Sequence, residues 1–326
     1  MPDHPVEPIF LLSLPRSGST LLQRLLASHS QVSTAPEPWL LLPLLYARRP
    51  HGAYAEYGHR VAAMALEDLV QRLPGGVDDY LAAVRRLALE TYGALAGGCP
   101  YFLDKTPRYS LVVDDLLRAF PDARFICLWR NPLAIVASLT ASWAGGRWRP
   151  WMHKVDLYDG LAALCQAVTL HPDRFTVVRY EAVVKDPVGQ CEALFAALGL
   201  PSEPSVVADF ARLELGGTVG DKTGTATYDH VSTASLSKWR EALASPVRKA
   251  WCRQYVEWIG DRRLATMGYD IDGLRAAVDE LEDDWRRLVP DAYLSAKGVI
   301  YNLLEPPTLR AKLRSARSWR DVHNLT

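Results

Sequence analysis

Two hydrophobic patterns alternate along the chain. The first consists of short, nearly continuous apolar runs bounded by polar or turn residues, and it covers residues 9–14, 101–105, 124–130 and 174–181. Runs of this length predict strands, because helices in globular proteins usually need about ten or more residues. Their continuous apolar character is typical of strands that are covered on both faces, as in a parallel sheet.

Between these runs, apolar residues recur at helical spacing. In residues 19–28, four leucines (Leu21, Leu22, Leu25 and Leu26) fall on one helical face. Further helices are predicted over residues 57–73, 77–95, 110–120, 132–143 and 187–198. Strands that alternate with helices predict an α/β fold, here a P-loop-like, three-layer domain with a central, mostly parallel sheet flanked by helices.

The C-terminal part of the chain follows a different pattern. Residues 201–233 are rich in Gly, Thr and Asp and show little periodicity, which predicts a long loop of the kind that usually has a function. We expect residues 1–290 to form one domain and residues 291–326 to form a C-terminal helical tail. Within that tail, residues 308–319 predict a basic helix.

Composition narrows the function classes. Of the 326 residues, 49% are hydrophobic, and 37 Lys+Arg balance 37 Asp+Glu, so the overall charge indicates neither a nucleic-acid-binding nor a membrane-surface protein. The five cysteines lack the close spacings of metal or redox sites, and we interpret them as reduced core thiols. No secretory leader is evident, and the longest apolar run, residues 39–47, falls short of the ~18 needed to span a membrane. A cytoplasmic protein is expected.

The loop between the first predicted strand and helix has the sequence LPRSGST (residues 14–20). A strand that enters a Gly/Ser/Thr loop and then a helix directs backbone N–H groups and the positive end of the helix toward one point, which suits a tetrahedral anion. The nucleotide-kinase pattern GxxxxGK[ST] is absent, and the first 100 residues contain no Lys. The alternative is a helix start that is merely capped by Ser17 or Ser19.

Several motifs together resemble one family. They are SLPRSGSTLL (13–22), DKTPRY (104–109), RFICLWRNPLAIVASL (124–139), VVRYEAVVKDP (177–187), FAALGL (195–200) and SLSKWREAL (235–243). In this order they resemble the sulfotransferases that use 3′-phosphoadenosine 5′-phosphosulfate (PAPS), in a bacterial branch similar to tyrosylprotein sulfotransferases. The resemblance covers roughly residues 8–270 and implies that the 1–290 unit is a sulfotransferase domain.

The resemblance implies a PAPS site. Its loop would hold the 5′-phosphosulfate, and Arg130 with Ser138 would hold the 3′-phosphate from two sides. A third phosphate contact of the branch falls on Ser142, so Arg147 or Arg149 would have to supply it. Residues 220–224 resemble part of a cover over the cofactor. The implied cofactor-binding residues are Arg16, Ser17, Gly18, Ser19, Thr20, Arg130, Ser138, Tyr180, Ser237 and Lys238.

Sulfuryl transfer needs a base for the acceptor proton and positive charge near the leaving oxygen, and it demands no metal. Arg16 is the predicted leaving-group cation, and Lys105 matches a family lysine near the transferred group. Glu37, held between Pro36 and Pro38, resembles the base of the Glu-using branch. The rival bases are His29, His51, His59 and His153, of which His29 is interpreted as a residue satisfied at a helix end.

The sequence leaves the acceptor open. Residues 40–98 and 143–154 are expected to shape its pocket, and their Trp and Arg content suits a sugar ring, an aromatic ring or an acidic substrate. A carbohydrate hydroxyl is preferred, with peptide tyrosine or a lipid or natural-product alcohol as alternatives. The tail predicts either contact with a membrane or lipid substrate, or a solvated helix packed on the domain. The rival classes are a P-loop phosphotransferase and a non-catalytic nucleotide-binding protein.

Overall fold

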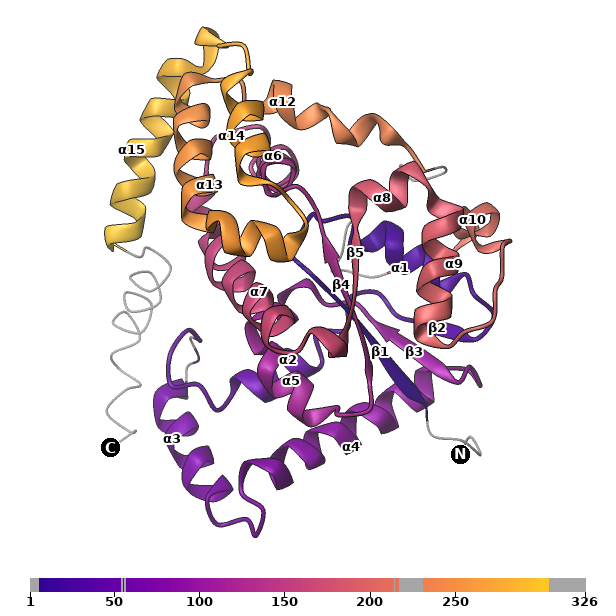
Figure 1. The fold of residues 1–326 in the computed structure, drawn as a ribbon. Helices are drawn as coiled ribbons and strands as arrows, with labels where there is room; N and C mark the ends of the chain where they lie inside the picture. Colours follow the sequence, from indigo (N-terminus) through magenta and orange to yellow (C-terminus); the bar gives the residue numbers. More distant parts are fainter. Residues whose placement is uncertain (1–5, 54, 56, 214, 217–230, 305–326) are drawn as a thin grey trace.

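The computed structural model describes residues 6–53, 55, 57–213, 215–216 and 231–304. Five parallel strands form one sheet in the order β2-β3-β1-β4-β5 (Figure 1). The strands are β1 (Glu7–Ser13), β2 (Val32–Thr34), β3 (Tyr101–Asp104), β4 (Arg124–Trp129) and β5 (Phe175–Arg179).

The α-helices connect and cover these strands. Their bounds are α1 Ser19–Ala27, α2 Leu41–Tyr46, α3 His59–Val70, α4 Val77–Leu95, α5 Val113–Ala119, α6 Pro132–Ser142, α7 Leu161–Leu170, α8 Tyr180–Lys185, α9 Pro187–Leu198, α10 Val206–Asp209, α12 Lys238–Ala242, α13 Pro246–Met267, α14 Ile271–Asp279 and α15 Leu288–Leu304. Short 3₁₀ segments are η1 Pro107–Val112, η2 Pro150–His153, η4 Pro172–Arg174, η5 Phe210–Arg212, η6 Thr233–Leu236 and η7 Trp285–Arg287, and η3 (Val155–Gly160) is a π-helix.

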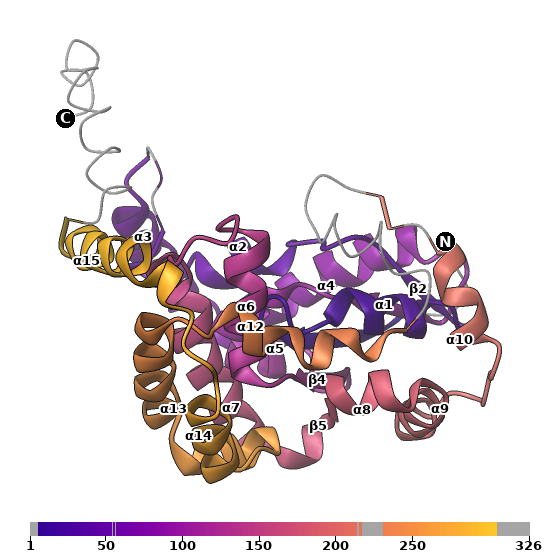
Figure 2. The same ribbon diagram turned by 90° about the horizontal axis from the view of Figure 1, so that it is seen from above.

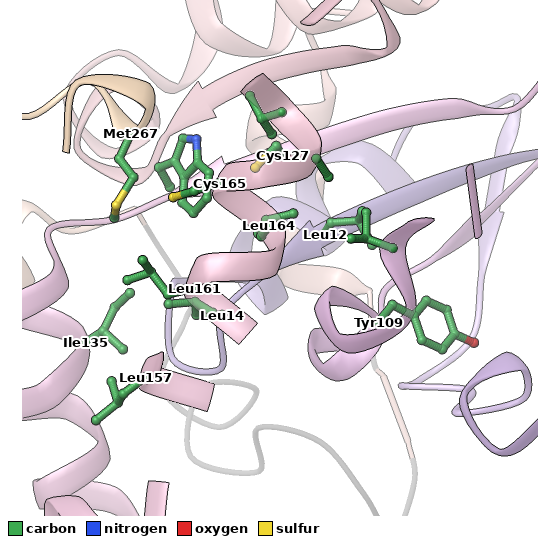
Figure 3. Packing of buried hydrophobic residues seen from close by; sticks show 14 of the residues in the cluster. Leu12, Leu14, Tyr109, Cys127, Ile135, Leu157, Leu161, Leu164, Cys165 and Met267 are labelled. Atoms are coloured by element: carbon green, nitrogen blue, oxygen red, sulfur yellow. The ribbon is translucent and has the colours of Figure 1, made fainter. Parts of the chain in front are cut away.

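Successive side chains of β1 point to opposite faces of the sheet, and helices cover both faces to give three layers. Phe10 and Leu12 point into a large apolar cluster with α4–α7, α13 and α14, whereas Ile9 and Leu11 point into a second cluster with α1 and α8–α10. Figures 1 and 2 show the two groups of helices on opposite sides of the sheet. Figure 3 shows Leu12, the following Leu14 and Leu164 of α7 within the larger cluster. The predicted α/β fold with a parallel sheet is confirmed.

Several predicted bounds need correction. The strand predicted over 174–181 ends at Arg179, and α8 begins at Tyr180. The helix predicted over 110–120 begins instead as the 3₁₀ segment η1, followed by α5. β2 was not predicted, because three residues are too few to show a period. The loop predicted over 201–233 contains α10 and η5 among its described residues.

The C-terminal helix α15 packs on the domain through a buried ion pair. Nε of Arg248 on α13 lies 2.7 Å from Oδ2 of Asp291, and both side chains are almost fully buried. The separation at residue 290 stays a prediction, and the helix predicted over 308–319 lies outside the described residues. Of the five free cysteines, four are buried and Cys99 is half-buried. Within the described part of the chain, no helix is long and apolar enough to cross a membrane.

Candidate functional site

All five strands direct candidate residues to one edge of the sheet. Glu37 follows β2, Lys105 follows β3, the loop containing Arg16 follows β1, Arg130 follows β4, and Tyr180 follows β5. Because parallel strands end at the same edge, the strand order arranges these residues across the sheet in that sequence. Residues separated by up to 164 positions in the chain (16 and 180) thus share one edge.

The loop after β1 has an unusual backbone. Arg16 and Gly18 adopt left-handed conformations with φ of 67° and 87°, and Ser17 N donates to Leu14 O at 3.3 Å. Helix α1 starts with Gly18 at its N-cap and has no side-chain cap hydrogen bond. The alternative interpretation, a helix start capped by Ser17 or Ser19, is therefore wrong. Ser19 and Thr20 form the buried first turn of α1, where the backbone N–H groups at a helix start suit an anion.

Arg130 and Tyr180 pack against this loop. Arg130 Nη1 donates to Arg16 O at 2.8 Å, and its guanidinium lies 4.4 Å from the Tyr180 ring centroid. The Tyr180 ring also abuts Gly18 so closely that an added Cβ would lie 2.3 Å from the ring. A residue other than glycine would therefore displace Tyr180 or the loop.

Two buried polar atoms at this point have no hydrogen-bond partner in the described residues. They are Oγ of Ser17 and Nε of Arg130, whose residues are 1% and 8% exposed. An unpaired buried donor carries a desolvation cost of about 1–3 kcal/mol. A ligand that accepts hydrogen bonds here would remove that cost. Ser138 on α6 joins the group, because its Oγ accepts from Arg16 Nε at 3.2 Å.

Glu37 and Lys105 form an ion pair at the other end of the edge. Lys105 Nζ lies 2.7 Å from Glu37 Oε1, and the two side chains are 2% and 11% exposed, respectively. The second carboxylate oxygen, Oε2, accepts from Trp39 Nε1 at 3.1 Å. Trp39 has a left-handed backbone with φ of 54°. Among the described residues, Arg16 and Trp39 are the only non-glycine residues with positive φ, and such strain tends to cluster at functional sites.

Two of the four rival histidines, His29 and His59, make hydrogen-bond-distance contacts of their own. His29 is buried, its Nε2 lies 3.0 Å from Pro201 O, and its Nδ1 accepts from Gln31 N at 3.1 Å. His59 Nε2 lies 2.8 Å from Arg49 O. His153 is buried, and desolvation lowers its pKa below the ordinary value. His51 is exposed. No hydrogen bond or ion pair links these histidines to Glu37 or Lys105 within the residues that the structure describes.

The segment before α12 brings another serine of the predicted motif to Tyr180. Ser237 and Lys238 are exposed, whereas Ser235, two residues earlier, has its Oγ 2.8 Å from the Tyr180 hydroxyl. Ser235 O also accepts from Arg130 Nη2 at 3.5 Å. The sequence analysis found the motif that contains Ser235, but it selected Ser237 and Lys238 as site residues and did not select Ser235. The predicted cover, residues 220–224, lies outside the described residues.

Other candidate residues lie around the edge. Glu181 accepts from Asn131 N at 2.9 Å and from the Tyr269 hydroxyl at 2.7 Å, so both of its carboxylate oxygens have partners. Burial, together with the Glu181 carboxylate, raises the pKa of Tyr269 above its ordinary value. Arg147 and Ser142 are exposed and Arg149 is half-buried.

A profile of the sulfotransferase family matches residues 8–204. The chain belongs to the sulfotransferase family. The match begins in β1 and includes the residues that follow all five strands. The family resemblance drawn from the motifs is confirmed, and the tyrosylprotein-like branch stays a prediction.

Individual family members extend the comparison. The nodulation protein NoeE of Sinorhizobium fredii is 30% identical over 290 residues, which is 80% of this chain and 65% of NoeE. An uncharacterized protein of Aquifex aeolicus is 32% identical over 78% of this chain and 32% of its own length. This chain thus spans less than two thirds of either relative.

Two solved sulfotransferase domains have the same fold. The domain from the Synechococcus PCC 7002 olefin synthase is 26% identical, with a TM-score of 0.51 over 73% of this chain and 90% of that domain. The domain from the curacin biosynthetic pathway is 24% identical, with a TM-score of 0.55 over 82% of this chain and 98% of that domain.

Proposed function

We propose that this protein transfers the sulfuryl group of PAPS to a hydroxyl acceptor. The observation that carries the proposal is the arrangement of the sheet edge. The loop at the end of β1 contains Ser17 Oγ, which is buried and has no hydrogen-bond partner among the described residues. It lies beside β3, whose end holds the Glu37–Lys105 pair. Family membership supports the reaction class.

The residues around the loop fit a phosphate-bearing donor. When bound, PAPS supplies an activated sulfuryl group and a bisphosphate leaving group. The loop and first turn of α1 would hold the phosphosulfate, while Arg130 and Ser138 would hold the 3′-phosphate. Ser17 Oγ and Arg130 Nε, unpartnered among the described residues, are the atoms that such oxygens would satisfy. The further nucleotide contacts are assigned to Tyr180, Ser237 and Lys238.

Arg16 and Lys105 are the proposed cations of the reaction. Arg16 neutralises charge on the leaving phosphate oxygen, because its backbone lies in the loop that would hold the phosphosulfate. Its Nε donates to Ser138 Oγ. Lys105 is 2% exposed and is held by Glu37. Its ammonium therefore acts where little water screens it, which strengthens its effect on the sulfuryl oxygens.

Glu37 is the proposed general base. Its carboxylate takes the proton from the acceptor hydroxyl as the hydroxyl oxygen approaches sulfur. Lys105 and Trp39 each hold one carboxylate oxygen, which orients the carboxylate and leaves a further lone pair on each oxygen. This preference for Glu37 over a histidine follows the resemblance to the Glu-using branch, and the separate partners of His29 and His59 support it.

The acceptor is tested by a direct screen. Methyl glycosides, a tyrosine-containing peptide and a long-chain alcohol are each incubated with PAPS, and sulfated products are sought by mass spectrometry. A carbohydrate product is expected, and sulfation of the peptide or the long-chain alcohol alone would replace it. The cytoplasmic location expected from the sequence remains a prediction.

Thermal shift distinguishes the rival classes. Stabilisation by adenosine 3′,5′-bisphosphate without Mg²⁺ is expected, because a ligand that binds only the folded state raises its stability. A requirement for ATP with Mg²⁺ would indicate a phosphotransferase instead. Binding of the bisphosphate with no turnover of any acceptor would favour a non-catalytic nucleotide-binding protein.

A further inference from the structure

A buried carboxylate lies one residue before Lys105. Asp104 is fully buried at the end of β3. Its Oδ2 accepts from the Tyr92 hydroxyl at 2.6 Å and from the Tyr109 hydroxyl at 2.9 Å, and its Oδ1 accepts from Thr106 Oγ1 at 3.0 Å. A buried carboxylate is costly unless its oxygens are hydrogen-bonded. Three hydroxyls donate to the Asp104 carboxylate. They come from α4, from η1 and from the turn between β3 and η1.

Two of these hydroxyls also hold the segment that carries Glu37. Trp39 N donates to Thr106 Oγ1 at 3.2 Å, and Leu41 N donates to the Tyr109 hydroxyl at 3.1 Å. A backbone N–H can only donate, so each hydroxyl accepts there and has its single hydrogen left for Asp104. Asp104 thereby turns both hydroxyls into acceptors for the segment.

The Tyr109 hydroxyl keeps its hydrogen in this arrangement. Burial and the nearby Asp104 carboxylate raise its pKa above the ordinary value, and the same causes raise the pKa of Tyr92. Both tyrosines therefore remain neutral donors at physiological pH.

The held segment is strained and contacts Glu37 directly. Trp39 has a φ of 54°, a conformation that is unfavourable for a non-glycine residue and persists only where surrounding contacts hold it. Its ring N–H donates to Glu37 Oε2. Moving Trp39 would therefore move the group that orients one carboxylate oxygen.

We infer that Asp104, acting through Thr106 and Tyr109, is a positioning residue that holds Glu37 in place for proton transfer. This inference rests on the proposed role of Glu37 as the base. Asp104, Lys105 and Thr106 are consecutive, so one turn holds Glu37 from two directions. Lys105 contacts Oε1 directly, and Thr106 acts through Trp39.

Tyr92 provides a matched control. It donates to the same oxygen of Asp104 as Tyr109 does, but no hydrogen bond to residues 35–41 is found for it within the described chain. Loss of either tyrosine hydroxyl removes one bond from the carboxylate, and only loss of the Tyr109 hydroxyl also frees Leu41 N. A merely structural network would respond equally to both changes.

The first measurement is amide hydrogen exchange of peptides covering residues 35–41, which needs neither PAPS nor an acceptor. Thr106→Val and Tyr109→Phe should speed exchange of this segment by about tenfold or more, whereas Tyr92→Phe should leave it within about twofold of wild type. Thr106→Ser keeps the hydroxyl and should restore protection. Equal exchange in Tyr92→Phe and Tyr109→Phe would overturn the inference.

The second measurement is kcat with the best acceptor from the glycoside, peptide and alcohol panel. Thr106→Val and Tyr109→Phe should lower kcat about tenfold or more with KM for PAPS unchanged, because misplacement of a base affects the chemical step. In a Glu37→Gln background, Thr106→Val should cost less than about twofold further. A full additional loss in that background would show that Thr106 does not act through Glu37.

The two measurements separate the inference from the proposed function. Selective loss of protection in the Thr106 and Tyr109 variants, with a wild-type enzyme that sulfates no acceptor, would uphold the anchoring of the segment and refute the sulfotransferase role. Turnover by the wild type with unchanged protection in both variants would uphold the sulfotransferase and refute the positioning role of Asp104.

Discussion

The two ends of the sheet edge differ in how their polar groups are satisfied. At the β1–β4–β5 end, Ser17 Oγ and Arg130 Nε are buried without a hydrogen-bond partner among the described residues. At the β2–β3 end, Asp104 accepts three hydroxyl hydrogen bonds, and Glu37 accepts from both Lys105 and Trp39. Polar atoms at the first end lack hydrogen-bond partners that a ligand could supply. The carboxylates at the second end already have hydrogen-bond partners within the protein.

This difference suits two functions, ligand binding at the first end and proton transfer at the second. A phosphate-binding site gains affinity when ligand oxygens satisfy donors that the protein leaves unpaired. A proton-transfer site gains rate when its groups are already oriented before the reaction. We therefore expect mutations at the β1–β4–β5 end to affect donor binding and mutations at the β2–β3 end to affect turnover.

Glu37→Gln gives the largest expected effect and the sharpest test of the β2–β3 end. It preserves size and keeps one of the two oxygens that accept from Lys105 and Trp39, but it removes the proton acceptor, so kcat should fall about 10²- to 10⁴-fold. The affinity for adenosine 3′,5′-bisphosphate, measured by calorimetry, should stay near wild type. Near-normal turnover in this variant, with loss in a His51 or His153 variant, would assign the base to a histidine.

Arg130→Ala tests the other end. Loss of a charge-assisted phosphate contact should weaken bisphosphate binding by about 2 to 4 kcal/mol in calorimetry. The matched control is Lys105→Ala, which should leave bisphosphate affinity nearly unchanged because the bisphosphate lacks the sulfuryl group. Equal losses of bisphosphate affinity in the two variants would contradict the proposal that one end of the sheet edge binds the donor and the other supports turnover.

Asp104 predicts a pH dependence of stability. Burial raises its pKa to about 6, while hydrogen bonds from Tyr92, Tyr109 and Thr106 and the charge of Lys105 oppose the rise. The folded state then binds more protons than the unfolded state between the two pKa values, so this carboxyl's contribution to stability falls as pH rises from about 4 to above 6. The fall is at most about 3 kcal/mol.

Urea unfolding of the wild type and Asp104→Asn across this range measures the contribution. The free energy of unfolding of the wild type should decrease relative to that of the variant as pH rises, because the amide does not titrate. Parallel pH curves for the two proteins would show that Asp104 keeps an ordinary pKa.

Arg16→Ala sharpens the comparison where the two ends meet. Arg16 follows β1, the strand of the β1–β4–β5 end that lies beside β3. Its Nε donates to Ser138 Oγ, and its carbonyl accepts from Arg130. We expect kcat to fall about 10²-fold while the bisphosphate still binds measurably. An unchanged kcat with a raised KM for PAPS would place Arg16 wholly with the binding end.

Local patterns were enough to predict much of the fold. The helices over 77–95 and 187–198 have the predicted bounds, because their periodicity is long and their ends carry turn residues. The loop after β1 was found because strand, glycine and helix signals are adjacent in sequence. β2 was missed because its three residues form a strand only by pairing with β3.

What the sequence determined by itself was the α/β order, the family and the motifs that contain the candidate residues, since each depends on neighbours along the chain. The tertiary structure alone decided which of these residues meet. The pairing of Glu37 with Lys105, the choice of Ser235 over Ser237 beside Tyr180, and the strained Trp39 held by Thr106 all join residues from distant elements. Such contacts follow from the parallel order of the strands and the packing of helices on the sheet, which bring separate segments to one edge and leave no local signal in any of them.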